Sequence, residues 1–300
     1  MNLHGIFPPI TTPFAADGSV ALERLRQNLA RYNSLPLAGY VCNGSTSESV
    51  LLLWDEVYKV WEAAKDAAAP GRILIAGTGA ESTAETISHT NRAAALGFDA
   101  ALVRTPSFYK PAISTEMLAA HYLRVADAAR IPILIYSVPV FTHVTVEASL
   151  IERVAAHPNI AGIKDSSGDV EGSAKIMAAA PKDFCLLCGS AVTLYETLRR
   201  GATAAVLAVS NAFPEACIEI YEAARAGDSA RASALQQRLV APSKMLGPQY
   251  GIAGIKYAMD RLGFYGGPPR PPLLPVGEAA QREIDAMLAS LATASAVSSD

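Results

Sequence analysis

The chain has 300 residues, of which 51% are hydrophobic and 18% are charged, and its formal net charge is −3. This balance gives no basic surface for nucleic acid or for an anionic membrane, and no apolar run reaches the roughly 18 residues of a membrane span. We therefore expect a soluble cytoplasmic protein with neither partner, large enough for two domains or for one closed α/β barrel.

The apolar runs and the helical stretches alternate along most of the chain. The runs that predict strands are Gly5–Ile10, Gly39–Cys42, Ile73–Ala76, Ala100–Val103, Ile133–Tyr136, Ile160–Lys164, Phe184–Cys188 and Ala204–Ala208. The stretches with helical spacing are 21–33, 55–68, 82–96, 114–129, 147–156, 170–180, 191–200 and 212–226. Many of them follow a Ser, Thr or Asp, the residues that favour a helix start.

This alternation predicts the fold. Repeated βα units without a strand-order reversal, and without a G-x-G-x-x-G turn after the first strand, favour an α/β (β/α)8 TIM barrel over an open sheet. We place the barrel at residues 1–226. Three more helical stretches, near 228–241, 251–262 and 277–292, predict a C-terminal helical extension at 227–292, and residues 293–300 are expected to form a flexible tail.

The cysteines and histidines show no metal-binding pattern. Four cysteines are too few for a disulfide scaffold in a chain of this length. Cys185 and Cys188 have C-x-x-C spacing, but they lie in an apolar run that is typical of a strand. The five histidines lack the paired spacings of a zinc site. We expect no metal and no cofactor.

Lys164 ends the sixth apolar run and is followed by a polar turn. Because TIM-barrel active sites lie at the carboxyl ends of the strands, this lysine is placed where ligands bind. Loss of solvation there favours the neutral amine, which can attack a carbonyl carbon and form a Schiff base. Taken alone, a strand-end lysine more often extends to solvent.

Two other strand ends carry candidate residues. The fifth run ends in Tyr136, whose phenol could move protons beside a lysine imine, although a core tyrosine with a satisfied hydroxyl would look the same in the sequence. The second run leads into Gly44, Ser45 and Thr46, small residues whose N–H groups and hydroxyls could receive a carboxylate. This turn could equally be a helix cap.

Together these segments resemble a known family. The phrases Gly44–Glu48, Tyr136–Pro139 and Gly162–Asp169 are similar in order and spacing to the signatures of the dihydrodipicolinate synthase / N-acetylneuraminate lyase family of class I aldolases. Residues 5–14 and 270–273 also match, so the resemblance covers nearly the whole chain.

The resemblance implies a homotetramer that acts on pyruvate or another 2-oxo acid. It implies that Lys164 is the Schiff-base nucleophile, that Tyr136 is the proton shuttle, and that Ser45, Thr46 and Gly44 hold the substrate carboxylate. Ser166 and Gly189 are further residues expected to line the substrate site.

Three positions depart from the synthase pattern. Phe141 stands where the synthases have an arginine that holds the second substrate's carboxylate, and phenylalanine cannot make such a charge-assisted bond. Phe108 replaces a tyrosine that the synthases contribute across a subunit contact, so either the proton relay differs or Tyr109 takes its place in the substrate site. Ser47 occupies a position that is commonly glycine in the family.

Other details resemble the 4-hydroxy-2-oxoglutarate aldolase branch, above all the long phrase 251–268. We therefore expect cleavage of 4-hydroxy-2-oxoglutarate to pyruvate and glyoxylate. The alternatives are dihydrodipicolinate synthase, which condenses pyruvate with aspartate semialdehyde, and a sugar-acid lyase or dehydratase. A protein that only binds a 2-oxo acid is the non-enzymatic alternative.

Overall fold

Eight parallel strands form a barrel in the computed structural model, which describes residues 1–297, with side chains as far as Thr293. The strands are β1 (Gly5–Ile6), β2 (Gly39–Cys42), β3 (Ile73–Gly77), β4 (Ala100–Arg104), β5 (Ile133–Ser137), β6 (Ile160–Asp165), β7 (Cys185–Cys188) and β8 (Ala204–Ala205). Their order around the sheet is β1-β8-β7-β6-β5-β4-β3-β2. Backbone hydrogen bonds from Val41 N to Pro8 O and from Ile10 N to Val41 O, both 3.0 Å, join the two edges. The expected (β/α)8 TIM barrel is confirmed.

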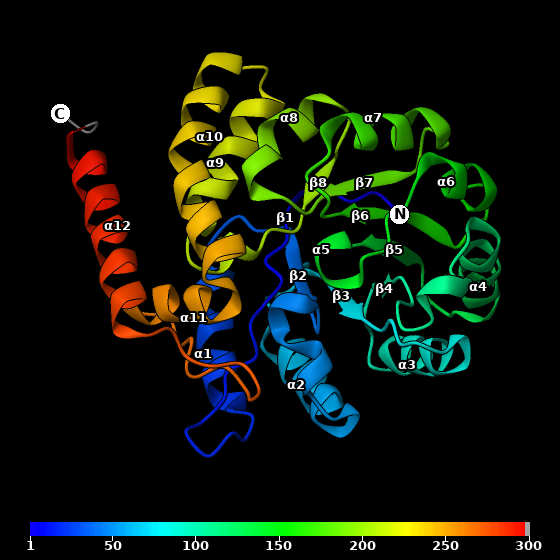
Figure 1. Cartoon of the computed structure of the whole chain (residues 1–300), viewed down its shortest axis with the longest axis horizontal. Helices are drawn as coiled ribbons and strands as arrows, with labels where there is room; N and C mark the ends of the chain where they lie inside the picture. Colours follow the sequence, from blue (N-terminus) through cyan, green and yellow to red (C-terminus); the bar gives the residue numbers. More distant parts are fainter. Residues whose placement is uncertain (298–300) are drawn as a thin grey trace.

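Helices surround the strands (Figure 1). One follows each strand: α1 (Leu22–Asn33), α2 (Trp54–Ala67), α3 (Thr83–Ala95), α4 (Thr115–Ala128), α6 (Ala148–Val154), α7 (Val170–Ala179), α8 (Leu194–Arg199) and α9 (Pro214–Arg225). Several begin as their sequences predict. The side chains of Ser82, Ser114 and Asp169 accept hydrogen bonds from the backbone N–H three residues later, which satisfies a donor that the helix leaves free.

The loops at the carboxyl ends of the strands contain short helices that the sequence periodicity did not predict. After β2 come the 3-10 turns η1 (Ser45–Ser47) and η2 (Ser49–Leu51), and after β5 comes α5 (Pro139–Thr142). Proline is favourable at the first position of a helix, because its N–H would have no partner there. Further unpredicted turns are η3 (Lys110–Ala112) and η5 (Ala208–Asn211), whereas η4 (Ala191–Thr193) opens the helical stretch expected at 191–200.

The first strand is shorter than expected. The apolar run Gly5–Ile10 contains Pro8 and Pro9, which lack the N–H of a regular ladder, and regular pairing ends at Ile6. The run still contributes to barrel closure through the carbonyl of Pro8 and the N–H of Ile10.

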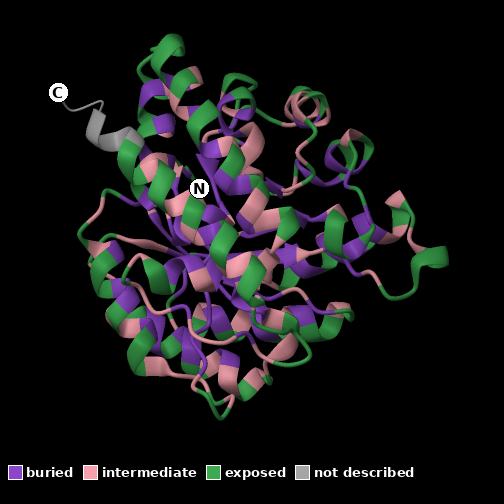
Figure 2. Ribbon diagram, turned by 60° about the vertical axis from the view of Figure 1, so that its left-hand side comes forward, coloured by how far each residue is buried: buried purple, intermediate pink, exposed green. Residues whose placement is uncertain are grey.

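The strand side chains alternate between two apolar layers. In β5, Ile133 and Ile135 pack toward the helices, whereas Leu134 and Tyr136 pack inside the barrel. The same period of two applies to β6, where Ile163 faces the helices. Lys164 therefore points into the barrel, and Figure 2 shows that the strands form the buried centre of the molecule.

The C-terminal extension contains α10 (Ser229–Lys244), the π turn η6 (Met245–Gln249), α11 (Gly251–Arg261) and α12 (Glu278–Val297). Buried residues Leu239, Ile255 and Met259 belong to the same apolar core as the barrel helices. In Figure 1, α12 lies at the outer edge of the molecule, next to α11.

The last helix, α12, extends into the segment that was expected to form a flexible tail. The helix continues to Val297 rather than ending at 292, because this alanine-rich stretch favours helix. The last part of the expected flexible tail, residues 298–300, lies outside the described residues. None of the helices in residues 1–297 combines the length and apolar character that crossing a membrane would need.

Candidate active site

Lys164 and Tyr136 lie side by side at the carboxyl ends of β6 and β5. They are directly paired in the register of the two strands, and their side chains are only 3% and 5% exposed. The Lys164 Nζ lies 4.1 Å from the centroid of the Tyr136 ring, within the range of a cation–π contact. Among the side chains that the structure describes, up to Thr293, this amine has no carboxylate partner. The amine is therefore free of a counter-ion and can approach a carbonyl carbon beside a phenol.

Ser45 reaches the same cluster from the turn after β2. Its Oγ lies 2.7 Å from the Tyr136 Oη, a hydrogen bond in which either hydroxyl can donate. Thr46 is the next residue of η1 and is 8% exposed. Both residues are at the start of a short helical turn, where backbone N–H groups have no acceptor within the turn. The structure thus brings Ser45 into contact with the expected proton shuttle, with Thr46 and Gly44 adjacent in the chain.

The loop after β6 is fixed by the carboxylate of Asp165. This carboxylate accepts hydrogen bonds from the Ser167 hydroxyl at 2.7 Å, from the Ser167 N–H at 3.1 Å and from the Ser173 hydroxyl at 3.1 Å. Gly189 N donates to the Asp165 carbonyl at 2.7 Å. A Cβ at Gly189 would overlap the Ser166 Oγ, so this position accommodates only glycine. Ser166 and Gly189 are therefore neighbours, directly after β6 and β7.

Tyr109 is not brought to this cluster. Its side chain is 75% exposed and stacks edge-on against Phe108, itself 74% exposed, with the ring centroids 5.1 Å apart. Phe141, on α5, is also exposed. Within one chain, Tyr109 therefore has no contact with Tyr136 or Ser45, and a role in the substrate site requires either movement of its loop or a second subunit.

The turn that carries Ser45 and Thr46 is anchored at its far end. The Ser47 Oγ donates to the Ile10 carbonyl at 2.5 Å, and the Thr12 Oγ1 donates to the Ser47 carbonyl at 2.7 Å. Ser47, where the family commonly has glycine, thus binds the turn to the segment after β1. The following residue, Glu48, has a left-handed backbone with a φ of 59°, a conformation that costs a non-glycine residue free energy.

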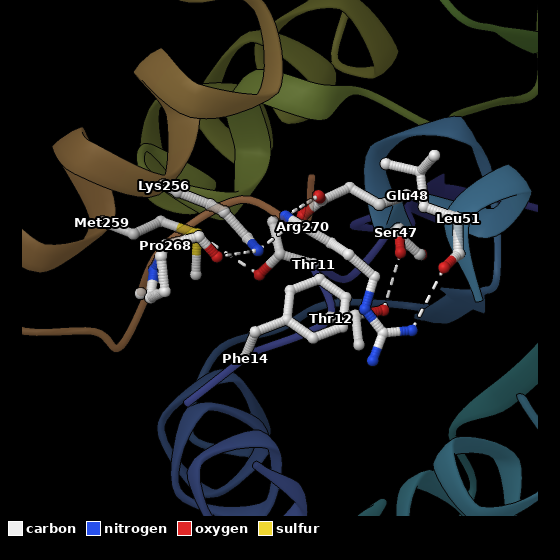
Figure 3. A network of polar contacts seen from close by, with 12 residues as sticks. Thr11, Thr12, Phe14, Ser47, Glu48, Leu51, Lys256, Met259, Pro268 and Arg270 are labelled. Carbon is white, nitrogen blue, oxygen red and sulfur yellow. Dashed lines mark hydrogen bonds and ion pairs between the residues drawn. The ribbon is translucent and has the colours of Figure 1, made fainter. Parts of the chain in front are cut away.

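The Glu48 side chain is held by the C-terminal extension (Figure 3). Its Oε1 forms a fully buried ion pair with Lys256 Nζ of α11 at 2.5 Å, and its Oε2 accepts a hydrogen bond from Arg270 N at 2.7 Å. Lys256 also donates to the Pro268 carbonyl at 3.0 Å and lies 4.4 Å from the Phe14 ring centroid. Burial lowers the pKa of Lys256, and the Glu48 carboxylate opposes that shift.

Sequence reasoning missed this support. Glu48 was part of a recognised motif and Lys256 part of a recognised phrase, but neither was assigned a contact. The available signal was a lysine inside the apolar helical stretch Ile255–Ala258, because a charge in such a stretch requires a buried partner. No group of three or more His, Cys, Asp or Glu side chains in the described part of the chain is arranged to hold a metal ion.

Comparisons with known proteins find the same family over nearly the whole chain. Residues 2–291 match the dihydrodipicolinate synthetase family. The 4-hydroxy-tetrahydrodipicolinate synthase of an Exiguobacterium species is 33% identical over 93% of this chain and 95% of that protein. The enzyme of the same name from Rhizobium meliloti is 35% identical over 95% of this chain and 97% of that protein.

Solved structures of dihydrodipicolinate synthases also resemble this chain over nearly its whole length. The dihydrodipicolinate synthase of Bacillus anthracis superposes with a TM-score of 0.92 at 25% identity, covering 97% of this chain and 99% of that one. The synthase of Acinetobacter baumannii, solved with pyruvate, has a TM-score of 0.89 at 30% identity, covering 95% of this chain and 97% of that one.

Proposed function

Since the chain belongs to the dihydrodipicolinate synthetase family, we propose that it is a pyruvate-dependent class I aldolase that makes or breaks a carbon–carbon bond through a Schiff base on Lys164. The observation that carries the proposal is the buried Lys164 amine beside the Tyr136 phenol, with the Tyr136 hydroxyl bonded to Ser45.

The chemistry follows from these groups. The amine of Lys164 adds to the C2 carbonyl of a 2-oxo acid, and loss of water gives an iminium ion that withdraws electrons from C3. Loss of a C3 proton then gives an enamine, whose carbon attacks an aldehyde, and the reverse sequence cleaves the bond. Tyr136 moves the protons, and Ser45 connects it to the turn that receives the substrate carboxylate.

For the aldehyde we propose aspartate semialdehyde, the partner in the 4-hydroxy-tetrahydrodipicolinate synthase reaction. The support is the identity of 33% and 35% to enzymes of that name over nearly the whole chain. The expected membership of the 4-hydroxy-2-oxoglutarate aldolase branch receives no support from these comparisons. Cleavage of 4-hydroxy-2-oxoglutarate remains the second candidate, because exposed Phe141 provides no charge for the carboxylate of aspartate semialdehyde.

Two experiments test these proposals. Borohydride with pyruvate should attach a pyruvate-derived mass to Lys164, and the Lys164→Ala variant should remain unlabelled, with Lys175→Ala, on α7, as the labelled control. Equal labelling of the Lys164 variant would contradict the Schiff-base assignment. Incubation with pyruvate and aspartate semialdehyde, and separately with 4-hydroxy-2-oxoglutarate, then separates the two reactions. Condensation without pyruvate release favours the synthase, and release without condensation favours the aldolase.

We also propose a homo-oligomer, with a tetramer as the expected state. Large apolar side chains are exposed on the loops after β2, β4 and β5, all at the carboxyl end of the barrel, namely Val50, Leu53, Phe108, Tyr109, Val140 and Phe141. Such exposure is typical of a surface that another subunit covers. Light scattering of the purified protein would measure the mass, and a monomer at micromolar concentration would contradict this proposal.

A further inference from the structure

The buried pair Glu48–Lys256 connects the C-terminal extension to the turn that carries Ser45 and Thr46. Both side chains are inaccessible to solvent, and Figure 3 shows them pointing toward each other from the turn after β2 and from α11. Taking two charges out of water is costly, so a buried pair contributes less stability than apolar packing of the same volume would. What such a pair does provide is a fixed geometry, because removing either partner leaves a buried charge without compensation.

The fixed geometry reaches the substrate site over a short path. The Glu48 N–H donates to the Ser45 carbonyl at 3.0 Å, and the Ser45 hydroxyl is bonded to Tyr136. Because the left-handed backbone of Glu48 is unfavourable, the residue needs its side-chain contacts to keep it there. Those contacts come from the extension alone: the ammonium group of Lys256 and the N–H of Arg270.

We propose that Lys256, acting through Glu48, is a positioning residue for the carboxylate-binding turn, so that the extension outside the barrel sets the affinity for the substrate's carboxylate. The inference rests on the proposed function, because it takes the substrate to be a 2-oxo acid that reacts at Lys164. Lys256 touches no reacting atom. It holds Glu48, Glu48 holds the backbone of Ser45, and the turn presents its N–H groups and hydroxyls to the carboxylate.

The test measures the ligand concentration that gives half-maximal borohydride labelling of Lys164, which requires no knowledge of the aldehyde. Lys256→Met removes the charge and keeps most of the side-chain volume. Glu48→Gln keeps the shape and the acceptor for Arg270 N but removes the other charge. We expect each variant to raise the half-saturating pyruvate concentration about tenfold, the effect of weakening one charge-assisted hydrogen bond. Labelling at saturating pyruvate should remain complete.

Two controls separate positioning from a general loss of stability. Hydroxyacetone lacks the carboxylate, so its half-saturating concentration should be the same in the variants and in the unaltered protein. Ile284→Ala removes a fully buried side chain from α12. This variant should have a lower melting temperature but the same pyruvate concentration for half-maximal labelling of Lys164.

The outcomes are distinct. Unchanged pyruvate dependence in the folded variants would overturn the positioning role, as would an equal change for hydroxyacetone or for Ile284→Ala. If Lys256→Met does not fold, the half-saturating pyruvate concentration of the isosteric Glu48→Gln variant tests the positioning role instead. Absence of label in the unaltered protein would refute the Schiff-base function itself, and this inference with it.

Discussion

The hydrogen bond between Ser45 and Tyr136 allows a quantitative test of the proton relay. At 2.7 Å it has the usual length of a bond between two hydroxyls, and Tyr136 is almost fully buried. A hydrogen bond of this kind contributes about 1 kcal/mol net, so Ser45→Ala should slow proton transfer at least about fivefold. Tyr136→Phe removes the acid–base group itself and should slow it by about 10² to 10⁴.

The two substitutions should not be additive. If Ser45 acts only by orienting and polarising the Tyr136 phenol, its replacement has no further effect once the phenol is gone. The double variant should then exchange protons at the rate of Tyr136→Phe alone, which corresponds to a coupling energy of about 1 kcal/mol.

The assay is exchange of the pyruvate methyl protons for deuterium, followed by proton NMR. Enamine formation causes this exchange, so the measurement does not depend on the aldehyde. If Ser45 instead binds the substrate carboxylate, the Ser45→Ala variant should need a higher pyruvate concentration for half-maximal exchange than the unaltered protein. Fully additive effects on the maximal rate would refute the relay and leave Ser45 with the carboxylate role that the sequence suggested.

Three further predictions follow from burial and charge. Burial lowers the pKa of His121 from 6.5 to about 4, so the unfolded chain takes up a proton first as the pH falls. The free energy of unfolding should therefore decrease by up to about 3 kcal/mol between pH 6.5 and 4, and urea titrations of His121→Gln should lack that decrease. Burial also raises the pKa of Cys188 to about 11, and all four cysteines are buried, so a thiol reagent should modify them only after denaturation. Rapid labelling of the native protein would contradict this. Phe141→Arg should increase kcat/KM for aspartate semialdehyde at saturating pyruvate, whereas Phe141→Leu should not; equal values would show that α5 does not face the second substrate.

The barrel and the position of Lys164 beside Tyr136 could be predicted because both depend on short-range regularities. Strands and helices alternate visibly in the sequence, and a period of two within a strand determines which residues face the barrel interior. Lys164 and Tyr136 each end an apolar run, and neighbouring parallel strands bring their carboxyl ends together. Ser166, in the polar turn after β6, was also expected to line the site, but the hydrogen bonds that Asp165 makes in this turn were not predicted.

The loops and the long-range support could not be predicted in the same way. Whether Tyr109 approaches the site depends on the path of a loop that has no periodicity, and the structure leaves it exposed. The contact between Glu48 and Lys256 depends on where α11 docks, which no local pattern encodes. Ser47 illustrates the same limit, because its replacement of glycine became interpretable only once its bond to Ile10 was visible.

The contact between Arg270 and Glu48 spans 222 positions of the chain, and this separation has a consequence for synthesis. A ribosome makes the chain from its N-terminus, so the turn near residue 48 is complete long before Lys256 and Arg270 leave the exit tunnel. Until then the nascent barrel has a carboxylate at an interior position without its counter-charge. We expect the turn that carries Ser45 and Thr46 to reach its final form only after Lys256 and Arg270 have left the tunnel, so a product that terminates before Lys256 would be a barrel in which this turn is not ordered.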